Sequence, residues 1–258
     1  MRKTILAILV LGLSLPVAGV AAAASGGAEL KKIEWSWQGA FGQYDRAELQ
    51  RGLQVYKEVC AACHGLRLIA FRNLMDLGYT ENQVKGFAKQ YEVQNKEPND
   101  EGEMFNRPGL PADRFVSPFP NEQAARAANG GAYPPDLSLI VKARAGGADY
   151  LYSLMVGYAD APAGVKPPAE NLQYNLHFPG NWIAMPPPLS EGAVEYADGT
   201  KATADQMARD LTAFLAWAAM PELEQRKQMG LAVMMFLVVF TGLLIATKKK
   251  VWEKVDKA

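Results

Sequence analysis

Both cysteines of this 258-residue chain and one of its two histidines fall within five consecutive residues, CAACH at 60–64. Two thiols three residues apart, followed directly by an imidazole, form the C-x-x-C-H signature for covalent attachment of a c-type haem. The thiols can add to the two vinyl groups of one porphyrin, and the adjacent histidine then presents its imidazole to the iron. The pattern therefore constrains the fold strongly, because the domain must enclose a large, flat and mostly apolar group.

Two other uses of the cysteine pair agree less well with the sequence. A thioredoxin-like redox pair does not need the following histidine and belongs in a βαβ context, which the sequence does not indicate. A disulfide between Cys60 and Cys63 would close a short and strained ring. With two cysteines, the chain can form neither a disulfide-dense scaffold nor a zinc site of four cysteines.

The segment before the haem motif has the pattern of an amphipathic helix. Asp45 and Glu48 have capping-box spacing, which predicts that a helix begins there. The apolar residues that follow have helical spacing along one face: Leu49, Leu53, Tyr56, Val59 and Cys63. We therefore expect the motif at the end of this helix, with the apolar stripe forming one wall of the haem site.

An uncharged segment of 18 residues near the C-terminus, 230–247, predicts a membrane-spanning helix. A helix of this length reaches about 27 Å, close to the thickness of the hydrocarbon core of a bilayer. Arg226 and Lys227 precede the segment and Lys248–Lys250 follow it. A buried core helix, the alternative, rarely ends in three lysines, and this cluster predicts that the C-terminal end stays in the cytoplasm.

The N-terminus has the organisation of a secretory signal peptide, with two basic residues, an apolar stretch at 5–15 and alanines at 21–24. We expect cleavage before Ser25, with Ala23 as the alternative start, rather than retention as an uncleaved anchor. The predicted organisation is a signal peptide at 1–24, an exported domain at 25–225, a membrane anchor at 226–250 and a cytoplasmic tail at 251–258. The exported domain would then lie on the periplasmic side of a bacterial inner membrane.

The formal net charge of zero is the sum of three unequal parts. The signal peptide contributes +2 and residues 226–258 contribute +5, whereas 25–225 has 18 basic and 25 acidic residues, a net charge of −7. Five acidic residues and one lysine lie between Glu92 and Glu103, which indicates either a solvated loop or a surface that steers a basic partner. An acidic exported domain is not expected to bind nucleic acid.

The sixth coordination position of the iron can be open or filled by histidine or methionine. The only histidine besides His64 is His177. Among the methionines of the exported domain, Met185 differs because three prolines, Pro186–Pro188, stiffen the backbone directly after it. The residues favour Met185 as the distal ligand and leave His177 as the alternative.

The last part of the exported domain predicts a second helix, which begins near Thr203 and Gln206 at capping-box spacing. Its apolar face would consist of Met207, Leu211, Phe214, Leu215 and Ala218. Pro221 predicts a break before the anchor. Segments 95–121 and 158–190 are rich in proline and glycine and predict long loops, and neither repeats nor a strand-rich region is evident, so the fold class is mainly α.

The order of motifs along the chain resembles that of the cytochrome c1 family. CAACH is followed by PPDLS at 134–138, ARAGG at 143–147 with Tyr150, MPPPL at 185–189, YADGT at 196–200, WAA at 217–219 and the terminal anchor. The resemblance extends from about Trp35 to the anchor. It implies a class I cytochrome c-like haem domain with long loop insertions, one C-terminal transmembrane helix and one covalently bound haem c.

The resemblance also implies roles for individual residues. Cys60 and Cys63 would form the thioether bonds, and His64 and Met185 would bind the iron as proximal and distal ligands. Arg144 and Tyr150 would lie by the haem propionates, and Asn129, Pro134 and Pro135 would line the pocket. His177 would then be a packed or surface histidine. Some bacterial members have an additional cysteine pair near the ligand loop; this chain lacks it, so packing alone must hold that loop.

The implied function is that of a membrane-anchored electron carrier in the cytochrome bc1 complex, without a catalytic site of its own. It would accept an electron from the Rieske iron–sulfur protein and pass it to a soluble, basic c-type cytochrome during quinol oxidation coupled to proton translocation. Cytochrome b is a further implied partner, within a dimeric complex. Two other classes stay open on the residues: a membrane-bound haem enzyme with an open sixth position, and a haem sensor.

Overall fold

The computed structural model describes residues 28–253, so the expected signal peptide lies outside the described part of the chain. Within it the fold is mainly helical, and its strands form two short antiparallel pairs. The elements are α1 Arg46–Glu58, η1 Cys60–Ala62, η2 Phe71–Leu77, α2 Glu81–Ala88, β1 Glu92–Gln94, β2 Asn106–Pro108, α3 Glu122–Ala128, α4 Ile140–Ala143, α5 Gly147–Val156, β3 Gln173–Tyr174, β4 Trp182–Ile183, α6 Ala204–Ala219 and α7 Leu223–Trp252. This confirms the expected mainly helical class with one C-terminal apolar helix.

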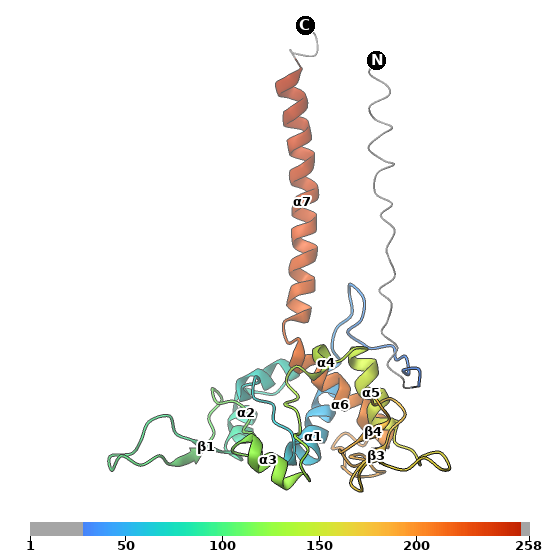
Figure 1. The fold of residues 1–258 in the computed structure, drawn as a ribbon. Helices are drawn as coiled ribbons and strands as arrows, with labels where there is room; N and C mark the ends of the chain where they lie inside the picture. The colour runs from blue at the N-terminus through green and yellow to red at the C-terminus, as the bar shows by residue number, and fades with distance from the viewer. Residues whose placement is uncertain (1–27, 254–258) are drawn as a thin grey trace.

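Helices α1 and α6 pack against each other at the centre of the domain, as Figure 1 shows. They come very close at Gly52, where an added Cβ would lie 2.0 Å from the carbonyl oxygen of Asp210. The Arg51 guanidinium spans the same crossing and donates to both carboxylate oxygens of the fully buried Asp210, at 3.0 and 2.9 Å. The crossing therefore depends on a glycine for proximity and on a buried ion pair for alignment.

The two predicted helix starts are confirmed, although neither forms a reciprocal capping box. The Asp45 carboxylate accepts from the backbone N–H groups of Ala47 and Glu48, which fixes the first turn of α1. The Glu48 carboxylate instead accepts from the hydroxyl of Ser36. The Thr203 hydroxyl caps α6 in the same way, and the predicted apolar face of α6 is buried throughout.

The haem motif differs in one respect from the prediction, because α1 ends at Glu58 and the motif continues as the 3-10 helix η1. Leu49, Leu53 and Tyr56 are buried, as the apolar stripe predicts, but Cys63 is exposed. A 3-10 helix rotates the chain by about 120° per residue instead of about 100°, so the α-helical face does not continue through it. Cys63 is therefore not part of the buried stripe.

Two long connections leave the helical core, as expected from their proline and glycine content. The connection from α2 to α3 contains the antiparallel pair β1–β2 and projects from the domain as an arm (Figure 1). The connection from α5 to α6 contains the pair β3–β4. The acidic residues between Glu92 and Glu103 lie on the arm, and all five of their side chains are exposed.

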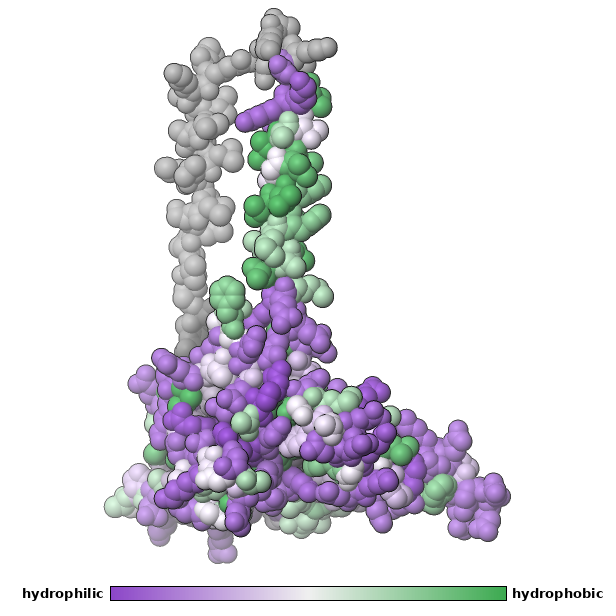
Figure 2. All heavy atoms as spheres, turned by 180° about the vertical axis from the view of Figure 1, so that it is seen from behind, coloured by the Kyte–Doolittle hydropathy of each residue, from purple (hydrophilic) through white to green (hydrophobic). Residues whose placement is uncertain are grey.

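Helix α7 is the one helix among the described residues that is long and apolar enough to cross a membrane. The chain breaks at Pro221 between α6 and α7, as predicted, and α7 begins at Leu223, three residues before the expected start of the anchor. Figure 2 shows a hydrophobic band along α7 between hydrophilic ends. The apolar side chains of this band face outward, so the band is available to lipid or to another membrane protein.

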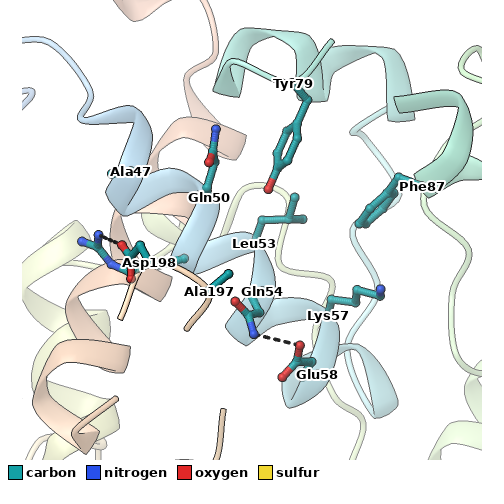
Figure 3. Close-up of a pocket in the computed structure, with 11 residues that line it drawn as sticks. Ala47, Gln50, Leu53, Gln54, Lys57, Glu58, Tyr79, Phe87, Ala197 and Asp198 are labelled. Atoms are coloured by element: carbon teal, nitrogen blue, oxygen red, sulfur yellow. Dashed lines mark hydrogen bonds and ion pairs between the residues drawn. The ribbon is translucent and has the colours of Figure 1, made fainter. Parts of the chain in front are cut away.

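A shallow groove runs along the outward side of α1, between Tyr79 and Phe87 on one side and the segment at Ala197 and Asp198 on the other (Figure 3). It contains charged groups such as Lys57 and none of the predicted haem residues. The haem motif lies at the C-terminal end of α1 instead. The groove is therefore separate from the site described next.

Candidate haem site

The two cysteines of the motif are free thiols in different surroundings. Cys60 is buried, and burial, with a smaller contribution from Cys63, raises the pKa of its thiol to about 12. Cys60 is therefore a neutral thiol at physiological pH, whereas Cys63 lies at the surface. Neither sulfur is used in a disulfide, so both are available for thioether bonds.

The imidazole of His64 is held in one orientation by the backbone of a distant segment. Its Nδ1 lies 2.8 Å from the carbonyl oxygen of Pro135, and because a carbonyl can only accept, Nδ1 carries the proton. Burial lowers the pKa of His64, partly offset by the Pro135 hydrogen bond and by the charge of Asp136. A neutral imidazole with a protonated Nδ1 leaves the lone pair of Nε2 free, which is the form that binds iron.

The PPDLS segment is fixed to the residues after the motif by a short series of hydrogen bonds. Leu137 N–H donates to the carbonyl of Gly65 at 2.9 Å, and the Asp136 carboxylate accepts from Arg67 N–H at 2.9 Å. The fully buried Ser138 hydroxyl accepts from Leu68 N–H at 3.1 Å. These bonds place the Pro135 carbonyl opposite His64. Asp136 and Ser138 are thus supporting residues that the sequence reasoning did not single out.

Met185 lies in a half-buried loop whose backbone is held by a tyrosine from another part of the chain. The Tyr158 hydroxyl donates to the carbonyl oxygen of Met185 at 3.0 Å. Burial raises the pKa of Tyr158, so the phenol remains a neutral donor at physiological pH. The pairing of β3 with β4, which ends two residues before Met185, anchors the loop on its N-terminal side. Tyr158 was not predicted, because no sequence motif connects it with Met185.

Arg144 directly follows α4, and Tyr150 lies in the first half of α5. Arg144 is exposed, and its guanidinium donates to the carbonyl of Ala143 at 3.2 Å. Burial raises the pKa of Tyr150, and the positive charge of Arg144 partly counteracts this effect. Tyr150 in turn contributes to the raised pKa of Tyr158.

The other predicted residues occupy different positions. Pro134 is half-buried beside Pro135, whereas Asn129 ends α3 and donates its side-chain amide to the Ala125 carbonyl of that helix at 2.7 Å. His177 is buried, and its Nδ1 lies 3.3 Å from the carbonyl oxygen of Ala28. His177 thus packs against the N-terminal segment, in agreement with the expectation of a packed histidine.

The donor set fits a c-type haem on its chemistry. One free thiol begins the 3-10 helix η1 and the other directly follows it, and a neutral imidazole with a free Nε2 comes next in the chain. A thioether is held in a loop whose backbone is fixed by Tyr158. The Arg144 guanidinium is at the surface, where it can pair with a carboxylate in two hydrogen bonds.

Comparisons with known proteins agree with this chemistry. Residues 35–255 match the model of the "Cytochrome C1 family". The chain is 48% identical to the cytochrome c1 of Rhodospirillum rubrum, over 96% of this chain and 97% of that protein. It is 54% identical to a mitochondrial haem protein of Solanum tuberosum named cytochrome c1-2, over 79% of this chain and 78% of the relative.

A third relative, from Bradyrhizobium diazoefficiens, is named cytochrome b/c1 and is 52% identical over 85% of this chain, which spans 35% of that longer protein. The family match extends over most of the chain, from Trp35 through the apolar helix α7. The chain belongs to the cytochrome c1 family, whose members are electron-transport proteins with one covalently bound c-type haem.

Proposed function

We propose that this chain is the haem-carrying electron-transfer subunit of a cytochrome bc1 complex. It accepts one electron from the Rieske iron–sulfur protein and passes it to a soluble, basic c-type cytochrome. Quinol oxidation and proton translocation are activities of the whole complex, and this subunit has no catalytic site of its own. Membership in the cytochrome c1 family and the name of the Bradyrhizobium relative support the assignment to this complex.

The hydrogen bond between His64 Nδ1 and the Pro135 carbonyl is the observation that carries the proposal. It fixes both the tautomer and the ring orientation, so that Nε2 serves as the proximal ligand while Cys60 and Cys63 hold the porphyrin through thioether bonds. Met185 supplies the distal ligand. When bound, the haem iron exchanges one electron by cycling between Fe(III) and Fe(II).

The residues around these ligands restrain the site. Tyr158 restrains the Met185 backbone, which limits the movement of the thioether between the two oxidation states. Arg144 and Tyr150 pair with the haem propionates, and Pro134 and Asn129 line the edge of the pocket. A fixed ligand set lowers the structural reorganisation that accompanies each electron transfer, as a reversible carrier requires.

The acidic arm that contains β1 and β2 provides the surface for the soluble acceptor. Its exposed carboxylates include Glu97, Asp100, Glu101 and Glu103, and the exported domain has a net charge of −7. Complementary charge raises the rate of encounter with a basic partner and loses this effect at high salt. Replacing these four residues by their amides is expected to slow the second-order oxidation of the reduced protein by the acceptor at low salt and to reduce the salt dependence.

Helix α7 anchors the subunit in the bacterial inner membrane, with the haem domain on the periplasmic side and Lys248–Lys250 in the cytoplasm. Its exposed apolar surface is the contact for cytochrome b, within a dimeric complex. The signal peptide at 1–24 directs export and is removed. The domain division is thus 25–225 for the haem domain, 226–250 for the anchor and 251–258 for the tail.

A redox titration of Met185→Leu in membranes tests the assignment of the distal ligand. Loss of the thioether is expected to lower the midpoint potential and to convert the oxidised haem from low-spin to high-spin, because methionine ligation favours the reduced iron. Met155→Leu is the matched control, since Met155 is also half-buried against the core. An unchanged potential and spin state in Met185→Leu would show that the distal ligand lies elsewhere.

A further inference from the structure

A tight loop before α1 exposes a single large aromatic side chain. Phe41 has 83% of its surface accessible, and it lies between Gly39 and Gly42. Gly39 has a positive φ of 72°, and a Cβ added at Gly42 would lie 1.9 Å from the carbonyl oxygen of Gln38. The loop therefore needs glycine at both positions, and its compact turn leaves Phe41 without packing partners in the domain.

This loop is fixed to the first turns of the membrane helix. The Lys227 ammonium group donates to the carbonyl oxygens of Trp37 and Gly42, at 2.7 and 2.8 Å. Directly after the loop, Arg46 forms two hydrogen bonds with the Glu224 carboxylate, at 3.0 and 2.8 Å. Figure 1 shows the loop, in blue, rising beside the lower end of α7. The position of Phe41 along the membrane normal is therefore set by α7.

The contact between the loop and Lys227 lies where the polar start of α7 changes to its apolar surface. Met229, two residues after Lys227, is 67% exposed and begins the outward-facing apolar surface of the helix. Two residues correspond to about 3 Å along a helix axis, so the loop is held at the level where the apolar surface starts. This level corresponds to the headgroup region of a bilayer, where aromatic side chains and snorkelling lysines concentrate.

We propose that Phe41 inserts into the lipid headgroup region and acts as a second membrane contact, beside α7, that sets the tilt of the haem domain. Phe41 is the one large apolar residue between 28 and 44 that is exposed. A protein partner normally needs a contiguous apolar patch, whereas a lone aromatic on a rigid turn suits a lipid interface. The inference rests on the proposed membrane position of α7.

Site-directed spin labelling of the full-length holoprotein tests the inference. Both native cysteines are expected to be bound to the haem, so Phe41→Cys introduces the one reactive thiol. The protein is reconstituted into vesicles of phosphatidylcholine and phosphatidylglycerol, and collision of the label with oxygen and with a water-soluble nickel chelate is measured. Val165→Cys is the matched control, because Val165 is exposed in the connection between α5 and β3, away from α7 (Figure 1). Met229→Cys provides the lipid reference.

At position 41 we expect nickel accessibility several-fold lower, and oxygen accessibility several-fold higher, than at position 165. Accessibilities equal to those at position 165 would overturn the inference. A label at position 229 that reports water would instead refute the membrane position of α7, and the inference with it. An unchanged haem spectrum in each labelled variant confirms that the domain has folded.

A second measurement addresses the assembled complex in native membranes. Phe41 is replaced by the photoreactive analogue benzoylphenylalanine, which forms adducts with whatever lies next to it on illumination. Adducts with phospholipid and none with protein are expected. A cross-link to cytochrome b as the main product would overturn the lipid assignment and identify the loop as a contact between subunits.

Discussion

The hydrogen bond from Tyr158 to Met185 gives a quantitative prediction about the stability of the proposed distal ligand. The substitution Tyr158→Phe removes only the hydroxyl that donates to the Met185 carbonyl at 3.0 Å. The ring remains, so its packing against the hydrophobic core is kept. What changes is the free energy that holds the loop, and with it the thioether, in the position from which Met185 is proposed to bind iron.

The expected magnitude follows from the kind of bond that is lost. A hydrogen bond between two neutral groups contributes about 1 kcal/mol net. Tyr158 is neutral, because burial raises its pKa, and Met185 is half-buried, so water can partly replace the lost donor. A loss of about 1 kcal/mol corresponds to an approximately fivefold larger population of loops with the ligand detached.

Competition by free imidazole measures this population. Imidazole binds the oxidised iron only when the thioether has left, so its apparent affinity for Tyr158→Phe should be about fivefold higher than for the native protein, in line with about 1 kcal/mol. Tyr79→Phe is the control: Tyr79 is a half-buried tyrosine in the groove on α1, with a pKa also raised by burial (Figure 3). An unchanged imidazole affinity in Tyr158→Phe, or an equal increase in Tyr79→Phe, would refute the role assigned to Tyr158.

Three further predictions concern the scaffold. Gly52→Ala places a Cβ 2.0 Å from the Asp210 carbonyl oxygen and should lower the free energy of unfolding by about 3 kcal/mol or more, measured by thermal denaturation followed at the haem absorbance. Arg51→Met leaves the Asp210 carboxylate buried without its cation and should cost about 3 kcal/mol in chemical denaturation, whereas a value near zero would contradict the importance of the pair. The hydrogen bond from Arg107 lowers the pKa of the Asp113 carboxyl in the folded protein. The pair should therefore contribute its full stabilisation at pH values above the pKa of Asp113 in the unfolded chain, about 4. This contribution should be lost as the pH falls through the lower pKa of the folded state. In Asp113→Asn, the free energy of unfolding should therefore fall less steeply as the pH is lowered below about 4. A dependence on pH identical to that of the native protein would exclude this contribution.

Local patterns in the sequence predicted much of the fold and the chemical class of the site. The spacing of the CAACH motif is enough to indicate covalent haem, and the apolar segment at 230–247 lies within α7. Asp45 and Thr203 cap helices where predicted, because a cap depends on residues within one turn. The change from α1 to η1, which exposes Cys63, was missed because an α-helical projection does not indicate where the winding of the helix changes.

The sequence by itself predicted that the chain carries haem, has a C-terminal apolar helix long enough to cross a membrane and is built mainly from helices, since each of these follows from residues that are neighbours along the chain. Only the tertiary structure decided how the proposed ligands are held. The Pro135 carbonyl reaches His64 across 71 residues, and the Tyr158 hydroxyl reaches Met185 across 27. The hydrogen bond from Lys227 to the carbonyl of Gly42, in the Phe41 loop, joins residues that are 185 positions apart in the sequence. Hydrogen bonds of this kind depend on the path of the whole chain in space, and no local spacing specifies that path.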